Sequence, residues 1–480
     1  MIDRKTPHLQ LPLPNEENEL DVDVQRIKTS LALVDENAGE QDAALKEHET
    51  RVDALETSAA DHDNRVACLE EDTTRHETAV NDHERRVAGL ERTAADHDNR
   101  VDSLEQESAT HATRDELYAH NLAQDAHDAL VKKITVGSLS PVVGVALVET
   151  GGGAGLWFNV DMDGTPISPT RRYWDYHPVY NSLRRVLVDS QVMVEHKKFY
   201  YKAMTLPSGP LAGKHARFIS PGPMDGFKPF PSFMRAGAEI PAWYCGAYSA
   251  TDEGGTPKKL GSRPGKMPFV NVDFPTMKSY CRNRNVDGVE NFSMWNIYQL
   301  SEIQLLYLLE YATPDSQATC GRGRVDTSSA ANVDATDVAT ASWRGHCGLW
   351  GNVWEMVDGL AVPPAGTIRL FKDDGSEQWV DTGRACLAYN GSAPQSIVTL
   401  QTGGGSGYSF DDVFFPASQA AAETAGTFPD KFWGRNGSAG NVLYSGGEWG
   451  QASGAGLFCL YLYQPASYAA TRLGVRLAKQ

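Results

Sequence analysis

Sulfur and imidazole groups are the side chains of this protein that could carry nucleophilic, redox or zinc chemistry, and their spacing favours none of these. The cysteines are scattered, without a CxxC pair or a repeated interval of the kind that binds zinc. They are Cys68, Cys245, Cys281, Cys320, Cys347, Cys386 and Cys459. His346 stands beside one of them in the motif GHC, but no partner that would orient a nucleophile is visible, and no GxSxG motif occurs. We therefore expect reduced and mostly buried cysteines, a structural His346 and no catalytic residue.

Oxygen-bearing side chains offer one candidate metal site, in the motif GNVWEM at 351–356. The Asn352 amide and the Glu355 carboxylate could tie loops together by hydrogen bonds, or they could ligate calcium. Calcium takes six or more oxygens, and these two residues supply too few. We expect hydrogen bonds, no metal and no other cofactor, with calcium as the alternative. Trp354, between the two residues, is interpreted as a core residue.

Large side chains on both faces of one predicted strand mark the segment GLFCLYLYQPASYAATRLGVRLAK at 456–479. Two sets alternate along it: Phe458, Leu460 and Leu462 in one, and Cys459, Tyr461 and Tyr463 in the other. Because side chains alternate across a strand, the first set would face a core and the second a partner. Tyrosine offers a large contact area with few torsions to freeze, and the nearby Arg472 can grip a carboxylate or phosphate. A strand buried on both faces fits the same periodicity.

Charge divides the chain into an acidic segment and a neutral body. Residues 1–130 contain 32 Asp and Glu against 13 Lys and Arg, whereas the remaining residues contain 30 against 31. Such a distribution lacks the basic footprint that nucleic acids and anionic membranes require. No apolar run long enough for a secretory signal or a membrane span is visible. We expect neither nucleic acid nor a membrane as a partner.

A heptad repeat runs through the acidic segment. Units such as HETRVDALETSAAD and HDNRVACLEEDTTR keep an unbroken a/d seam from Leu20 to His111, which predicts a coiled coil of roughly 140 Å. Histidines recur at position d: His48, His62, His76, His83, His97 and His111. We interpret them as hydrated layers that fix register, with an axial ion or a response to pH as alternatives. Three parallel strands are favoured over two.

The remainder of the chain, beyond the segment 138–155, is rich in Gly, Pro, Trp and Tyr with many short apolar runs. This punctuation is typical of an α+β fold with short strands and long ordered loops. One helix is predicted over 301–312, with Ser301 as its N-cap and its apolar side chains packed on a sheet.

Two segments resemble parts of phage tail fibres. The sequence at 11–35 resembles their N-terminal attachment segment, and AHNLAQDAHDALVKKI at 119–134 resembles the histidine-rich trimerisation segment that follows their stalks. The resemblance implies four regions. They are an attachment segment at 1–19, a coiled-coil stalk at 20–117, a trimerisation or neck region at 118–165, and a head at 166–480.

The head resembles the formylglycine-generating-enzyme branch of the C-type lectin fold. The resemblance rests on the segments 192–202, 221–251, 294–309, 348–360, 445–450 and 473–479. The oxidation chemistry of that enzyme uses a pair of cysteines in its C-terminal region, whereas residues 387–480 here contain only Cys459. We therefore expect a member of this fold that is not an enzyme.

One subgroup of that branch, the variable proteins of diversity-generating retroelements, has a C-terminal segment similar to this one. The matching scaffold positions are Gly446, Gly447, Trp449, Ala455, Gly456, Phe458, Leu460, Leu462, Pro465, Ser467, Gly474 and Arg476. The resemblance implies a receptor-binding set between them: Tyr444, Glu448, Gln451, Cys459, Tyr461, Tyr463, Gln464, Tyr468, Ala470 and Arg472. Phe428 and Trp433 fit either the border of this surface or the core.

Together these features predict a homotrimeric viral tail fibre with a coiled-coil stalk and a C-type lectin-fold head. Its expected partners are a protein or glycan receptor on a host bacterium and other tail proteins at the N-terminus. The expected location is the virion, after synthesis in the host cytoplasm. The alternatives are a lectin-fold binding protein displayed on a bacterial surface, or a relative of the formylglycine-generating enzyme.

Overall fold

The computed structural model describes residues 4–5, 12–13, 24–32, 46–51, 140–149, 155–389, 395–420, 428–435 and 440–480. The chain divides into two compact units, residues 1–121 and 122–480. In the first unit β1 (Arg4–Lys5) pairs with β2 (Pro12–Leu13), and residues 24–32 and 46–51 are α-helical. The rest of the predicted stalk, with every histidine layer except His48, lies outside the described residues.

The second unit mixes helices with a larger number of strands, which confirms the predicted α+β class. Its larger sheet has a main path of ten strands within the described residues. In order across the sheet these are β23 (Pro416–Ala420), β20 (Gln395–Leu400), β24 (Lys431–Trp433), β26 (Gly456–Tyr461), β25 (Asn441–Gly446), β17 (Trp354–Val362), β27 (Leu473–Lys479), β13 (Ala242–Ser249), β7 (Gln191–Lys197) and β6 (Arg184–Val188). Branching from this path are β16 (Phe292–Met294), β18 (Thr367–Phe371) and β19 (Trp379–Ala385).

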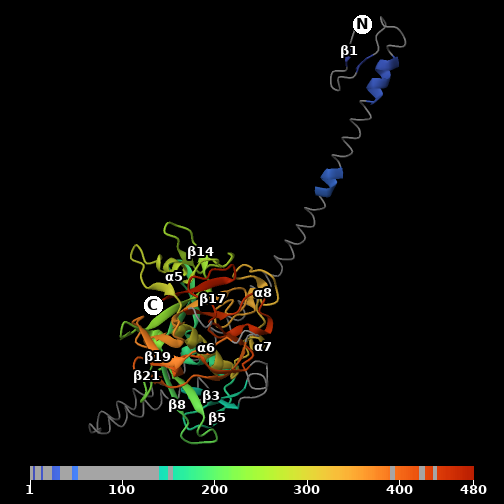
Figure 1. Cartoon of the computed structure of the whole chain (residues 1–480). Helices are drawn as coiled ribbons and strands as arrows, with labels where there is room; N and C mark the ends of the chain where they lie inside the picture. The colour runs from blue at the N-terminus through green and yellow to red at the C-terminus, as the bar shows by residue number, and fades with distance from the viewer. Residues whose placement is uncertain are drawn as a thin grey trace, which may run out of the picture. The chain divides into compact units, whose positions relative to one another are not determined.

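A second sheet combines strands from the predicted neck and the predicted head. In order it contains β10 (Lys228–Pro229), β8 (Tyr200–Thr205), β9 (His215–Ser220), β3 (Val143–Glu149), β4 (Leu156–Val160) and β5 (Pro166–Ile167). Figure 1 shows β3, β5 and β8 together at one end of this unit. Because β3 pairs with both β9 and β4, residues 143–149 and 156–160 of the predicted neck lie in the same sheet as strands of the predicted head.

Helix α6 (Ile297–Tyr311) runs through the core. Its N-cap is Asn296, whose side chain accepts hydrogen bonds from the Tyr298 and Gln299 N–H groups, while the Gln299 side chain closes a capping box. The predicted N-cap, Ser301, is therefore wrong, because this box starts the helix four residues before the predicted start. Side chains on every face of α6 are buried, as expected for a helix enclosed by other elements.

The other helices are short. They are α3 (Arg171–Tyr176), α4 (Pro178–Asn181), α5 (Phe274–Arg282), α7 (Ser316–Thr319) and α8 (Thr336–Ala339). Two-stranded ribbons complete the unit: β11 (Met234–Arg235) with β12 (Ala238–Glu239), β14 (Thr251–Asp252) with β15 (Leu260–Gly261), and β21 (Gly404–Gly405) with β22 (Tyr408–Ser409). Within the part of the chain that the structure describes, no helix has the length and apolarity needed to cross a membrane.

Candidate functional site

A cleft of about 400 Å³ opens where the middle strands of the larger sheet meet two loops. Its lining residues are Trp354, Trp433, Tyr444, Glu448, Gly450, Gln451, Tyr461, Tyr468, Arg472 and Leu473. Six of the ten residues predicted to contact a receptor are among them: Tyr444, Glu448, Gln451, Tyr461, Tyr468 and Arg472. Residues from five strands and two loops thus converge on one concave surface.

Strand register brings the aromatic residues together. Tyr461 on β26 stands opposite Tyr444 on β25 and, on its other side, opposite Trp433 on β24. Side chains of directly paired residues project from the same face of a sheet, so these three rings share one face. Trp354, at the start of β17, pairs in parallel register with Leu473 on β27. The sheet therefore assembles the aromatic floor of the cleft.

The rings pack against one another at close range. The Tyr461 ring is stacked on Tyr444, with centroids 5.7 Å apart and planes 14° apart. It also contacts Trp354 at 5.2 Å and Trp433 at 5.7 Å, while the two indoles meet edge to face at 5.4 Å. Aromatic pairs in such geometries contribute about 0.5–1.5 kcal/mol each beyond area burial. The floor is consequently held in place by its own contacts.

Polar groups of the cleft come from its loops. Glu448 follows the two glycines that end β25, and Arg472 lies in the loop between β26 and β27. The Arg472 Nη1 atom is 3.8 Å from Glu448 Oε1, which is an ion pair without hydrogen-bond contact. Burial raises the pKa of Glu448, and the positive charge of Arg472 only partly opposes this. Among the described residues, neither Glu448 Oε2 nor the Tyr444 hydroxyl has a hydrogen-bond partner.

The turn before Glu448 requires glycine. Gly446 and Gly447 both have φ near +90°, at 90° and 85°, where L side chains are disfavoured. A Cβ atom on Gly447 would lie 2.6 Å from the Ala455 Cβ. This double-glycine turn sends the chain back toward β26 and holds Glu448 over the aromatic floor.

The first residues of β26 are fixed by buried side chains from other elements. The Leu457 N–H donates to Ser316 Oγ at 3.0 Å, and its carbonyl accepts from Gln304 Nε2 at 2.9 Å. The Phe458 N–H donates to Asp430 Oδ2 at 2.7 Å. Such bonds satisfy backbone groups in an irregular strand and set the position at which Tyr461 emerges into the cleft.

The predicted inward set on β26 is confirmed, since Phe458, Leu460 and Leu462 are buried. The outward position of Cys459 is wrong, because its side chain is fully buried as well. The register between β25 and β26 shifts between Ser445 and Gly446, so the first half of β26 does not keep a regular alternation of faces. Burial also raises the pKa of the Cys459 thiol, and we remove this residue from the contact surface.

Three other predicted contact residues lie beside the cleft rather than in its lining. The Tyr463 ring contacts Tyr461 at 6.2 Å and Tyr389 at 5.1 Å. Gln464 donates through Nε2 to the Tyr461 hydroxyl at 3.3 Å. The Ala470 carbonyl accepts from the Asn271 N–H at 3.0 Å. These residues support the cleft wall, with only part of their surface exposed.

Trp354 and Trp433 line the cleft although neither is in the predicted contact set. Trp354 is buried, as a core residue would be, yet one surface of its ring forms part of the floor. Trp433, for which border and core were both open, lines the cleft next to Trp354. Phe428 packs on Phe458 in the core instead. Alternation along a single strand carries no information about tryptophans on two other strands.

Hydrogen bonds engage both Asn352 and Glu355: Asn352 ties two loops together as expected, whereas Glu355 on β17 links the strands β13 and β27. The Asn352 side chain accepts from the Ala331 N–H at 2.8 Å and donates to the Ala331 carbonyl at 3.1 Å. Glu355 accepts from Arg476 Nε at 2.9 Å and from Ser249 Oγ at 2.7 Å, with all three side chains buried. In the described residues no three His, Cys, Asp or Glu side chains are grouped as metal ligands.

His346 is a buried hydrogen-bonding residue, as predicted. Its Nδ1 lies 3.0 Å from the Trp343 carbonyl, and its Nε2 lies 3.1 Å from His196 Nε2. The other ring nitrogen of His196, Nδ1, lies 2.8 Å from Glu302 Oε1. The cysteines of the described residues are free, and all except the half-buried Cys320 are buried.

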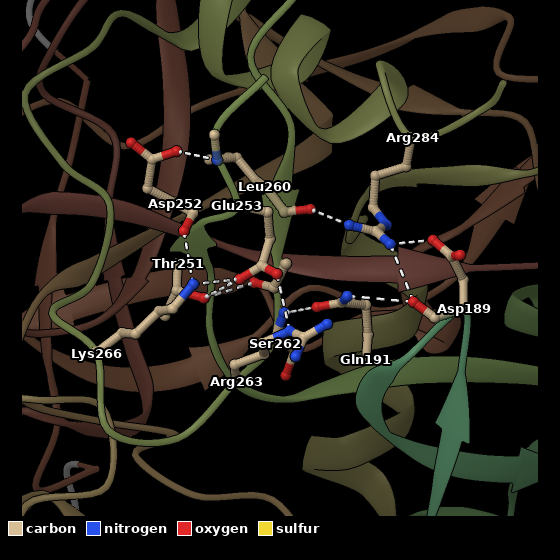
Figure 2. A network of polar contacts seen from close by, with 12 residues as sticks. Asp189, Gln191, Thr251, Asp252, Glu253, Leu260, Ser262, Arg263, Lys266 and Arg284 are labelled. Atoms are coloured by element: carbon tan, nitrogen blue, oxygen red, sulfur yellow. Dashed lines mark hydrogen bonds and ion pairs between the residues drawn. The ribbon is translucent and has the colours of Figure 1, made fainter.

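A second polar cluster surrounds the ribbon of β14 and β15 and is closed on itself (Figure 2). Glu253 lies 2.8 Å from both Arg263 and Lys266, and Arg284 pairs with Asp189. Gln191 joins the two halves by accepting from the Ser262 N–H at 2.9 Å. Since its acidic groups are paired with arginine and lysine side chains of the same cluster, this cluster secures loops.

No protein-family model matches the chain. No curated protein matches it either. Among solved structures the chain is similar to PvdO from Pseudomonas aeruginosa, with a TM-score of 0.26 and 11% sequence identity over 62% of this chain and 98% of that one. At that TM-score the similarity supports no conclusion about fold, activity or ligand.

Proposed function

We propose that this chain is a homotrimeric viral tail fibre protein, which binds a receptor on the host bacterium through the cleft of a C-type lectin-fold head. The observation that carries the proposal is the convergence of six sequence-selected residues on one aromatic cleft. A preformed concave site with aromatic walls and a few polar groups is typical of a ligand-binding surface. Diversification of the residues around this cleft by a retroelement is part of the proposal.

Exposed seam residues support the oligomeric part of the proposal. Val24, Ile27 and Leu31 belong to the a/d seam of the predicted coiled coil, and in a single chain they are 39%, 44% and 60% exposed. Apolar side chains on one stripe of a helix are normally covered by a partner helix. Three copies of the head on one stalk would also convert weak single-site binding into avid attachment.

The test is attachment of the purified full-length protein, carrying a fluorescent label, to cells of the host bacterium. We expect saturable binding by the wild-type protein and its loss in Trp433→Ala and Tyr461→Ala, which remove cleft walls. Trp379→Ala is the matched control, because Trp379 is an exposed tryptophan on β19 outside the cleft. Equal attachment by all these proteins would contradict a receptor site in the cleft.

A further inference from the structure

The carboxylate of Glu448 in the cleft indicates which class of ligand the cleft binds. We propose that the cleft binds an ammonium group, of the kind that a lysine side chain of a protein receptor carries. This inference rests on the receptor-binding function proposed above and adds the chemistry of the ligand to it.

Glu448 supplies the first part of the argument. The residue is 8% exposed, so its carboxylate is largely removed from water. Its Oε2 atom has no hydrogen-bond partner among the described residues, and the carboxylate otherwise has a backbone hydrogen bond from Gly450 and the long contact of Oε1 to Arg472. A buried carboxylate in this condition costs free energy that a donor from a ligand would recover. A cationic donor recovers more than a neutral hydroxyl, because it also supplies the missing charge.

The aromatic floor supplies the second part. This floor consists of the adjoining rings of Trp354, Trp433 and Tyr461. The Tyr444 ring is stacked on Tyr461. The face of an aromatic ring carries negative potential and attracts a cation within about 6 Å, most strongly at tryptophan. The volume of about 400 Å³ exceeds what an ammonium group alone needs. An alkyl stem lying along the rings would fill the remaining space and keep the charge at Glu448.

Arg472 is the one cation in the lining, and its placement fits this inference. Its side chain is 45% exposed at the rim and shares a hydrogen bond with Tyr468. Solvent screens a charge in that position more than it screens the buried Glu448. Arg472 would therefore weaken the binding of a cation without preventing it, whereas it would donate hydrogen bonds to a sugar. Removal of the Arg472 charge should therefore strengthen the binding of a cation and weaken the binding of a sugar.

The experiment titrates the full-length protein with Nα-acetyl-lysine methylamide and follows tryptophan fluorescence and saturation-transfer NMR. Nα-acetyl-norleucine methylamide, which has the stem without the charge, and a set of methyl glycosides are the comparison probes. We expect saturable binding of the lysine probe alone. Glu448→Gln should weaken it at least about tenfold, since hydrogen bonds to charged groups are the strong ones. Arg472→Gln should strengthen it a few-fold.

Equal binding of the norleucine probe, or lysine binding that Glu448→Gln leaves unchanged, would overturn the ammonium inference. Binding of a glycoside that Arg472→Gln weakens would replace it with a sugar ligand. If no lysine binding is seen while Trp433→Ala still abolishes attachment to cells, the ligand class is wrong and the receptor function stands. If Trp433→Ala attaches as wild type does, the receptor function itself fails.

Discussion

His196 Nε2 lies 3.1 Å from His346 Nε2, with both imidazoles buried. Only one of two facing ring nitrogens can carry the shared proton. His346 Nδ1 lies beside the Trp343 carbonyl, which can only accept, so a neutral His346 presents a bare Nε2. His196 must then donate from Nε2 and accept at Nδ1, where Glu302 Oε1 lies at 2.8 Å. The chain of bonds is complete with both histidines neutral only if Glu302 is protonated.

The pKa shifts run in the directions that this arrangement requires. Burial raises the pKa of Glu302 to about 8 and lowers that of His196 to about 3, and it also lowers the pKa of His346. Glu302 Oε2 still accepts hydrogen bonds from Trp243 Nε1 at 2.6 Å and from Ser232 Oγ. A neutral carboxylic acid thus occupies the core of the head at neutral pH.

We predict that Glu302→Gln leaves the free energy of unfolding at pH 8 no lower than that of wild type. Glutamine reproduces the protonated acid, because its amide donates to His196 and its carbonyl accepts from Trp243. The matched control is Glu310→Gln on the same helix, where an ionised carboxylate pairs with Arg344 at 2.8 Å. Loss of that pair should cost about 1–3 kcal/mol, because Arg344 keeps its ion pair with Asp175. Urea unfolding monitored by fluorescence measures the free energy of unfolding of both variants. If Glu302→Gln loses as much as Glu310→Gln, Glu302 is ionised in the folded protein.

The free energy of unfolding should also depend on pH differently in wild type and in Glu302→Gln. Because the pKa of Glu302 is raised to about 8, the folded protein keeps a proton between pH 4.5 and about 8. The unfolded chain has already released that proton. Its contribution is fully present below pH 4.5 and is lost as pH rises to about 8, at about 1.4 kcal/mol per pH unit. Wild type should therefore lose stability relative to Glu302→Gln across that interval. Parallel curves for the two proteins would contradict the shift.

Arg476→Met should destabilise the head by about 3–5 kcal/mol, because it leaves the buried Glu355 carboxylate without its cation. The guanidinium also donates to the carbonyls of Gly246 and Gly348, at 2.9 Å and 2.8 Å. Arg472→Met is the control, since an arginine near half exposure contributes less than about 1 kcal/mol. Thermal unfolding of both variants measures the contrast. Similar losses of stability in the two variants would mean that burial does not increase the contribution of Arg476 to folding.

Sedimentation equilibrium of the full-length protein should give three times the mass of the chain. Replacement of Ile27 and Leu31 by Asp puts charge into the predicted seam and should reduce the mass, or lower the temperature at which the trimer dissociates. Lys28→Asp, on an exposed position of the same helix away from the seam, should have little effect. A monomer in the wild-type protein would exclude the proposed coiled coil.

Sequencing of the gene across a viral population should find substitutions concentrated at the codons of Tyr461, Tyr468 and Arg472. The codons of Trp354 and Phe458 should stay constant, because their side chains belong to the core. At Cys459 only small apolar replacements should appear, since the side chain has no access to solvent. Equal constancy at all these codons would leave a receptor-binding protein of fixed specificity.

The sequence was informative where local rules determine structure. Alternation along β26 correctly placed Phe458 and Leu460 in the core, and turn residues with short apolar runs correctly indicated an α+β head. It failed where the outcome depends on pairing between distant strands. The register shift beside Gly446 buried Cys459, and no local pattern reports such a shift. The N-cap error has a similar cause, since Asn296 lies in a stretch whose apolar neighbours fit a strand as well as a helix.

Only part of the cleft lining could be predicted from the sequence. Six lining residues between 444 and 472 could be selected through the resemblance of the C-terminal segment to variable proteins, whereas Trp354 reaches the cleft through a parallel pairing with Leu473. Contacts of that kind join segments more than a hundred residues apart, and single-sequence periodicity does not encode them. The chain of Glu302, His196 and His346 was missed for the same reason, although buried charged residues within an apolar helix offered a signal.

The floor of the cleft comes from paired strands, whereas Gln451, Tyr468 and Arg472 at its entrance come from loops. Substitutions at the entrance can therefore change which ligands are admitted while the strands preserve the depth of the cavity and the stability of the head. Under the proposed receptor-binding function, this division predicts that mutations which change the bound receptor carry little folding cost.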